Sequence, residues 1–100
     1  MKIIADILVQ CRIYQDNEWK NLGECRLRLT HDSISIEVHA PAGPFCIDSA
    51  FSELNAELEQ SAVGSVLYLV WRDSNREVAL EVRGPESQLD RFYAAVLSLE

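Results

Sequence analysis

The stretch from Glu24 to His39, ECRLRLTHDSISIEVH, decides the fold that the sequence predicts. Its apolar residues occupy alternate positions on both sides of a tight turn at His31 and Asp32, as in two strands that each bury one face. A connection this short joins only antiparallel neighbours. Residues 24–30 and 33–39 are therefore expected to form a β-hairpin.

The same period of two continues outward from this hairpin. Residues 3–13 place an apolar side chain at every odd position, which indicates a long strand with one buried face. Residues 65–71 and 77–83 flank a polar turn and are expected to form a second hairpin. Prolines interrupt the pattern between the hairpins, and proline cannot donate a hydrogen bond to a ladder. Residues 45–48 are therefore expected to form at most a short strand.

Residues 51–59 fit both a helical and a strand period. Phe51, Leu54 and Leu58 would share one face of a helix, but Leu54 and Leu58 also alternate with acidic residues. The composition favours a helix, because Glu, Ala and Leu are good helix formers and no β-branched residue occurs in the segment. We therefore expect a helix at about 49–61.

A second helix is expected at about 85–99, because Pro85 and Glu86 suit the first helical turn and apolar residues follow at helical spacing. Together these elements predict an α+β fold with a curved antiparallel β-sheet of about six strands, in the order β-β-β-(β)-α-β-β-α. A chain of 100 residues has room for a single domain, which would span residues 1–100.

If residues 51–59 form a strand instead, the chain has about seven strands and a closing C-terminal helix. That layout resembles a pleckstrin-homology-type (PH-like) barrel, and the resemblance lies in the element count. The resemblance implies an adaptor that binds peptides more than phosphoinositides. The loop after the first strand carries one basic residue, Lys20, and two acidic ones, Asp16 and Glu18, whereas a phosphoinositide requires basic residues.

The composition excludes several classes of protein. A formal charge of −7 argues against nucleic acid or an anionic membrane as the main partner, since both require a basic surface. Three cysteines without a secretory signal predict reduced thiols and a cytoplasmic location. The stretch Leu8-Val9-Gln10-Cys11 has the position of a lipoprotein cleavage site, but Asp6 interrupts the apolar run and Gln10 replaces the required small residue.

No combination of residues matches a catalytic or metal-binding motif, so we expect no enzymatic activity, no cofactor and no metal. The neighbours His31, Asp32 and Ser33 cannot form a hydrolytic relay within one turn. Cys25 and His39 have opposite parities in their strands and cannot easily converge on zinc with Cys46. A small enzyme remains an alternative, whose supports are the thiol of Cys46 and the pair Glu53 and Glu57.

The charge is unevenly distributed along the chain. The block from Leu29 to Trp71 contains six carboxylates and no Lys or Arg. It therefore accounts for nearly all of the excess of negative over positive charge in the chain. We interpret it as an acidic surface that attracts a basic protein. The sequence thus predicts a protein-protein interaction module, an inhibitor or immunity-type protein that covers a basic toxin or enzyme. The expected binding residues are Asp48, Glu53, Glu57 and Glu59, with Trp19 as an aromatic anchor.

Overall fold

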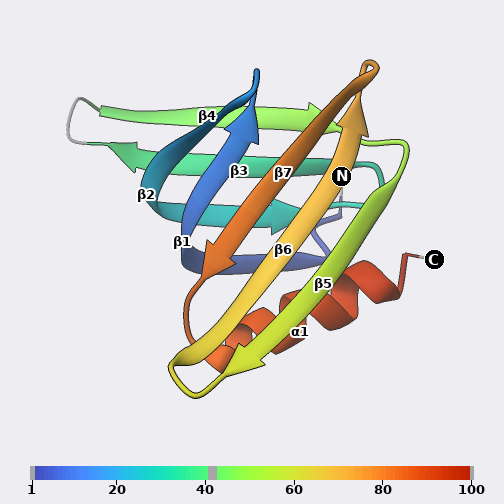
Figure 1. Ribbon diagram of the computed structural model, residues 1–100. Coiled ribbons are helices and arrows are strands. Elements are labelled where there is room, and N and C mark those ends of the chain that lie inside the picture. The colour runs from blue at the N-terminus through green and yellow to red at the C-terminus, as the bar shows by residue number, and fades with distance from the viewer. Residues whose placement is uncertain (1, 41–42, 100) are drawn as a thin grey trace.

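In the computed structural model, which describes residues 2–40 and 43–99, the chain forms one antiparallel sheet and one C-terminal helix (Figure 1). The elements are β1 (Ala5–Gln15), β2 (Glu18–Leu29), β3 (Ser33–Ala40), β4 (Gly43–Ala50), β5 (Leu54–Ser61), β6 (Gly64–Asp73), β7 (Arg76–Arg83) and α1 (Glu86–Leu97). The strands of this described sheet pair in the order β4-β3-β2-β1-β7-β6-β5. The predicted α+β class with an antiparallel sheet is confirmed.

The predicted helix at about 49–61 is wrong, because this region contains the end of β4 and all of β5. β5 pairs with β6 along its whole length. Its residues Leu54, Ala56 and Leu58 pack against the core, while the residues between them are exposed. Backbone hydrogen bonds to β6 and the burial of one face outweigh the helix propensity of Glu, Ala and Leu.

The short strand predicted at 45–48 is β4, which is eight residues long. The described part of the chain contains seven strands, where about six were predicted. Pro44 is tolerated in β4 because this strand lies at the edge of the sheet. Seven strands and one helix agree with the element count of the alternative fold. The barrel itself is not supported, because the described sheet is open and has β4 and β5 as its two edges.

β1 joins the two halves of the sheet. It pairs with β2 along its whole length but with β7 only from Gln10 to Tyr14. The sheet is therefore strongly bent, and β6 and β7 cross in front of β2 to β4 in Figure 1.

The predicted C-terminal helix is confirmed as α1, which packs against β1, β5 and β6. Its residues Leu89, Phe92 and Val96 are at most 1% exposed. Where β1 has left β7, the backbone N–H of Leu8 donates instead to Oε1 of Gln88 on α1, at 3.2 Å. The helix thus covers the part of β1 that β7 does not reach.

Two-residue turns close the β1-β2 and β6-β7 hairpins. Asp16 and Asn17 have φ values of 56° and 64°, and Ser74 and Asn75 have φ values of 51° and 71°. Two successive positive φ values are typical of type I′ turns, which Asn and Asp tolerate better than other residues. Glu18 and Lys20, which were expected in the loop after the first strand, belong to β2 together with Trp19.

Trp71 lies in the core and is 1% exposed. Its Nε1–H donates a hydrogen bond to Oγ of Ser49 at 2.8 Å, and the Ser49 hydroxyl donates to Oδ2 of Asp73 at 2.7 Å. Ser49 belongs to the edge strand β4, whereas Trp71 and Asp73 belong to β6. These two bonds therefore connect the two halves of the bent sheet.

Candidate functional site

The side chains that point away from the core on β2, β1, β7, β6 and β5 form one continuous surface, which we call the outer face. Strand register places four apolar side chains in a row across it, because Trp19 pairs with Tyr14, Tyr14 with Ala79, and Ala79 with Val70. We call these four residues the apolar row. Tyr14, Ala79 and Val70 are half-buried, and Trp19 is 42% exposed.

Trp19 is held in place by its neighbours. Its ring centroid lies 5.3 Å from that of Tyr14 with an interplanar angle of 54°, and the Arg12 guanidinium lies 5.0 Å from the Trp19 ring centroid. Tilted aromatic pairs and cation–π contacts both stabilise such a cluster. An exposed aromatic ring with restricted motion loses little conformational entropy on binding, so Trp19 is suited to anchor a partner.

A charged row runs beside the apolar row, in the order Arg12, Glu81, Tyr68 and Glu57. Glu81 is only 7% exposed and forms ion pairs with Arg12 at 3.5 Å and with Arg83 at 2.8 Å. Its charge is therefore compensated within the molecule and is not offered to a partner.

The carboxylates of Glu57 and Glu59 lie at the margin of the outer face. They point outward from β5 at a spacing of two residues, which corresponds to about 6.8 Å along a strand. Glu53, just before β5, lines a shallow cavity with Val70 and Arg72. These three glutamates, which we call the acidic ridge, form no ion pair with any residue that the structure describes.

The structure thus places four of the five expected binding residues around one surface, namely Trp19, Glu53, Glu57 and Glu59. The fifth, Asp48, lies apart from them. It points outward from β4, opposite Ser35, and five strands separate β4 from β5 in the sheet order. Asp48 is therefore not part of the acidic ridge.

Sequence reasoning missed Tyr14, Ala79 and Val70 of the apolar row. The alternation within each strand shows that these side chains face away from the core. Their alignment depends on the pairing of β1 with β7, which are about 65 residues apart in the chain. No local pattern reports such a pairing.

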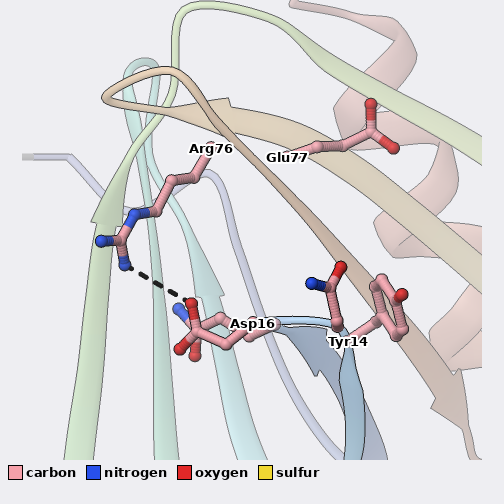
Figure 2. A pocket seen from close by; sticks show the side chains of 6 residues that line it. Tyr14, Asp16, Arg76 and Glu77 are labelled. Atoms are coloured by element: carbon pink, nitrogen blue, oxygen red, sulfur yellow. Dashed lines mark ion pairs between the residues drawn. The ribbon is translucent and has the colours of Figure 1, made fainter.

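A polar notch adjoins the apolar row at Tyr14, where the ends of the β1-β2 and β6-β7 hairpins meet. It has a volume of about 530 Å³ and is lined by Tyr14, Gln15, Asp16, Asn17, Arg76 and Glu77. Figure 2 shows the Arg76 guanidinium turned toward the Asp16 carboxylate, at 3.6 Å, with the Glu77 side chain pointing away from that pair. Two carboxylates against one guanidinium leave the notch net acidic, so it extends the acidic surroundings of the apolar row.

The other residue sets considered for chemistry do not converge. His31 and Asp32 are exposed in the β2-β3 turn, where the Thr30 and Ser33 hydroxyls are 2.6 Å apart and close the turn locally. Cys25 is buried in the core, whereas Cys46 is exposed on the edge strand β4. Within the residues that the structure describes, no three His, Cys, Asp or Glu side chains are grouped as metal ligands would be.

Two of the three thiols are shielded from solvent. Cys11 and Cys25 are both buried, on neighbouring positions of β1 and β2. A hydrogen bond to the Cys25 sulfur, together with burial, raises the pKa of the Cys11 thiol far above its usual range. Cys11 therefore stays protonated at neutral pH and acts as a small apolar side chain.

No helix in the described part of the chain combines the length and the apolar character needed to cross a bilayer.

Comparisons with known proteins give the chain no family. No protein-family model and no curated protein sequence matches it. Among solved structures it is similar to ErpC, a member of the complement regulator acquiring family of surface proteins from Borrelia burgdorfei, with a TM-score of 0.47 and 11% identity over 90% of this chain and 98% of that one. A likeness at this level carries no argument about function.

Proposed function

We propose that this chain is a protein-protein interaction module that binds a basic protein through its outer face. In the form that the charge distribution favours, it is an inhibitor or immunity-type protein that covers a basic toxin or enzyme in the cytoplasm. The observation that carries the proposal is the apolar row with Trp19 at one end and the acidic ridge close to the other.

The apolar row supplies the part of an interface that contributes most to affinity. Interfaces combine an apolar, partly aromatic centre with a polar border, and Trp and Tyr are over-represented among their hot spots. Trp19 and Tyr14 meet this description, and Val70 and Ala79 extend the apolar surface toward β5.

The acidic ridge supplies attraction and orientation. Glu53 shares a cavity with Arg72, whereas Glu57 and Glu59 are exposed and form no ion pair among the described residues, so the field of these two glutamates acts on solvent and on an approaching partner. Complementary charge mainly raises the association rate, and salt screens the effect. The spacing of Glu57 and Glu59 fits an extended basic segment with cationic side chains at alternate positions better than a helix.

The experiment compares three variants with the wild-type chain. Partner proteins are captured from native lysate, identified, purified and measured for association and dissociation rates at 50 and 300 mM salt. Glu57→Lys combined with Glu59→Lys reverses the ridge, Trp19→Ala removes the anchor, and Asp90→Lys reverses an exposed carboxylate on α1 as the matched control.

We expect the captured partner to be basic. In the variant with the reversed ridge, the association rate should fall about ten-fold or more and should lose most of its dependence on salt. Trp19→Ala should mainly speed dissociation, by about ten-fold or more, as truncation of an aromatic hot spot does. Asp90→Lys should bind almost as the wild type does. An acidic partner, or equal association rates for the ridge and control variants, would contradict the proposal.

A further inference from the structure

A second cavity lies between α1 and the outward side of β1 to β3, at the opposite end of β1 from Tyr14 and the apolar row. It has a volume of about 500 Å³ and is lined mainly by Asp6, Leu8, Arg26, His39, Gln88 and Arg91. We call it the α1-β1 cleft. Its size is in the range of sites that hold small ligands or a few residues of a peptide.

The polar groups around the α1-β1 cleft leave a surplus of hydrogen-bond donors. Both oxygens of Asp6 already accept bonds from Nε and Nη2 of Arg26, each at 2.9 Å, so Nη1 of Arg26 remains available. Oε1 of Gln88 accepts the Leu8 N–H, which leaves the amide NH₂ of Gln88 as a donor. Arg91 is exposed and forms no ion pair with any residue that the structure describes. The vacant positions therefore suit a ligand rich in acceptors.

The net charge of the cleft lining favours a ligand that carries one negative charge. Two guanidinium groups, of Arg26 and Arg91, face a single carboxylate, that of Asp6, so the lining carries one net positive charge in an otherwise acidic protein. His39 adds no uncompensated charge, because its Nε2 lies 3.1 Å from the carboxylate of Glu37.

One wall of the cleft is apolar. The side chain of Leu8 is 48% exposed there, on the half of β1 that does not pair with β7. Covering it with an aliphatic group would remove apolar surface from water and would stabilise a bound ligand.

From these three features we infer that the α1-β1 cleft binds a carboxylate carried on a short aliphatic chain. Arg91 holds the carboxylate, the Gln88 amide donates to it, and Leu8 contacts the aliphatic part. Such a carboxylate occurs at the C-terminus of a peptide that ends in an aliphatic residue and in a free short-chain acid. The inference is independent of the proposed function, because the cleft shares no lining residue with the apolar row or the acidic ridge.

The test is an NMR titration of the ¹⁵N-labelled protein, following the Leu8 backbone amide and the Gln88 side-chain NH₂. The probes are hexanoate and acetyl-Ala-Leu with a free C-terminus, and the neutral controls are hexanamide and acetyl-Ala-Leu-amide. The variants are Arg91→Gln and, as a matched control on the exposed face of β6, Arg72→Gln.

We expect saturable shifts of both resonances with at least one of the two anions, and at least ten-fold weaker binding of its neutral analogue. Arg91→Gln should weaken binding of the anion at least ten-fold, and Arg72→Gln should leave it unchanged. The anion that binds more tightly identifies the source of the carboxylate. The inference is overturned if neither anion gives saturable shifts, or if the neutral analogues bind as tightly as the anions. It is also overturned if Arg91→Gln and Arg72→Gln bind the anion with equal affinity.

Discussion

At the scale of single residues, Asp6 is the centre of a charge network across β1, β2 and β3. Its carboxylate accepts two hydrogen bonds from Arg26, and the Arg28 guanidinium lies 3.6 Å away. Arg28 in turn lies 3.8 Å from Glu37. These alternating charges compensate one another, whereas the glutamates of the acidic ridge take part in no ion pair among the described residues.

Hydrogen bonds from Arg26, reinforced by the charges of Arg26 and Arg28 and only partly opposed by burial, hold the pKa of Asp6 below its usual value. A depressed pKa means that the network stabilises the fold above pH 4 and that this contribution is lost as the pH falls through the folded-state pKa. We predict that Asp6→Asn is less stable than the wild type at pH 7, and that the difference shrinks below pH 4. Urea unfolding between pH 2 and pH 7 measures it, and parallel stability curves down to pH 2 would contradict the prediction.

At the scale of elements, the passage from β7 into α1 depends on close contact with β1. Gly84 lies at this junction, and a Cβ added there would be 2.9 Å from Cγ1 of Val9, which is 3% exposed. Any larger residue must displace a packed side chain of the core. The junction sets where α1 starts, and so determines how the helix covers β1.

We predict that Gly84→Ala costs about 1–3 kcal/mol, as overpacking does. In a Val9→Ala background the added methyl group has room, so the double variant should be more stable than the sum of the single changes implies, by about 1 kcal/mol. Chemical denaturation of the four proteins gives this coupling energy. Strict additivity would show that the contact with Val9 is not what excludes a side chain at position 84.

At the scale of the whole molecule, side chains rather than a backbone ladder connect the edge strand β4 with β6 across the bent sheet. Ser49 on β4 accepts the Nε1–H of Trp71 and donates to Asp73, both on β6. A buried indole N–H without a partner is costly, so these bonds help to fix how the two halves cross.

Ser49→Ala should therefore destabilise the protein by about 1–3 kcal/mol, because it leaves the Trp71 N–H unpaired in the core. The matched control is Ser35→Ala on β3, whose hydroxyl makes no hydrogen bond with the residues that the structure describes, and which should cost at most about 0.5 kcal/mol. Urea unfolding followed by tryptophan fluorescence compares them. Equal stabilities of the two variants would mean that the bond contributes nothing.

The sequence by itself determined the features that arise from local order. Alternating apolar residues identified most of the strands, and short polar turns identified the two hairpins at 24–39 and 65–83. Polar turn residues located the ends of the hairpins. Pro85 and Glu86, which suit the first turn of a helix, located the start of α1. The distribution of charge along the chain indicated the glutamates of the ridge, since the absence of Lys and Arg from Leu29 to Trp71 is a property of the sequence alone.

Only the tertiary structure decided whether residues 54–61 form a helix or a strand, and which side chains share the outer face. A helix satisfies its backbone groups internally, so local propensity can predict it, whereas a strand is stable only beside a partner. β5 is a strand because β6 offers that partner, and β1 aligns Tyr14 with Ala79 because the chain returns to it as β7. Trp19 and Glu57 therefore lie on one surface because of pairings between residues far apart in the sequence.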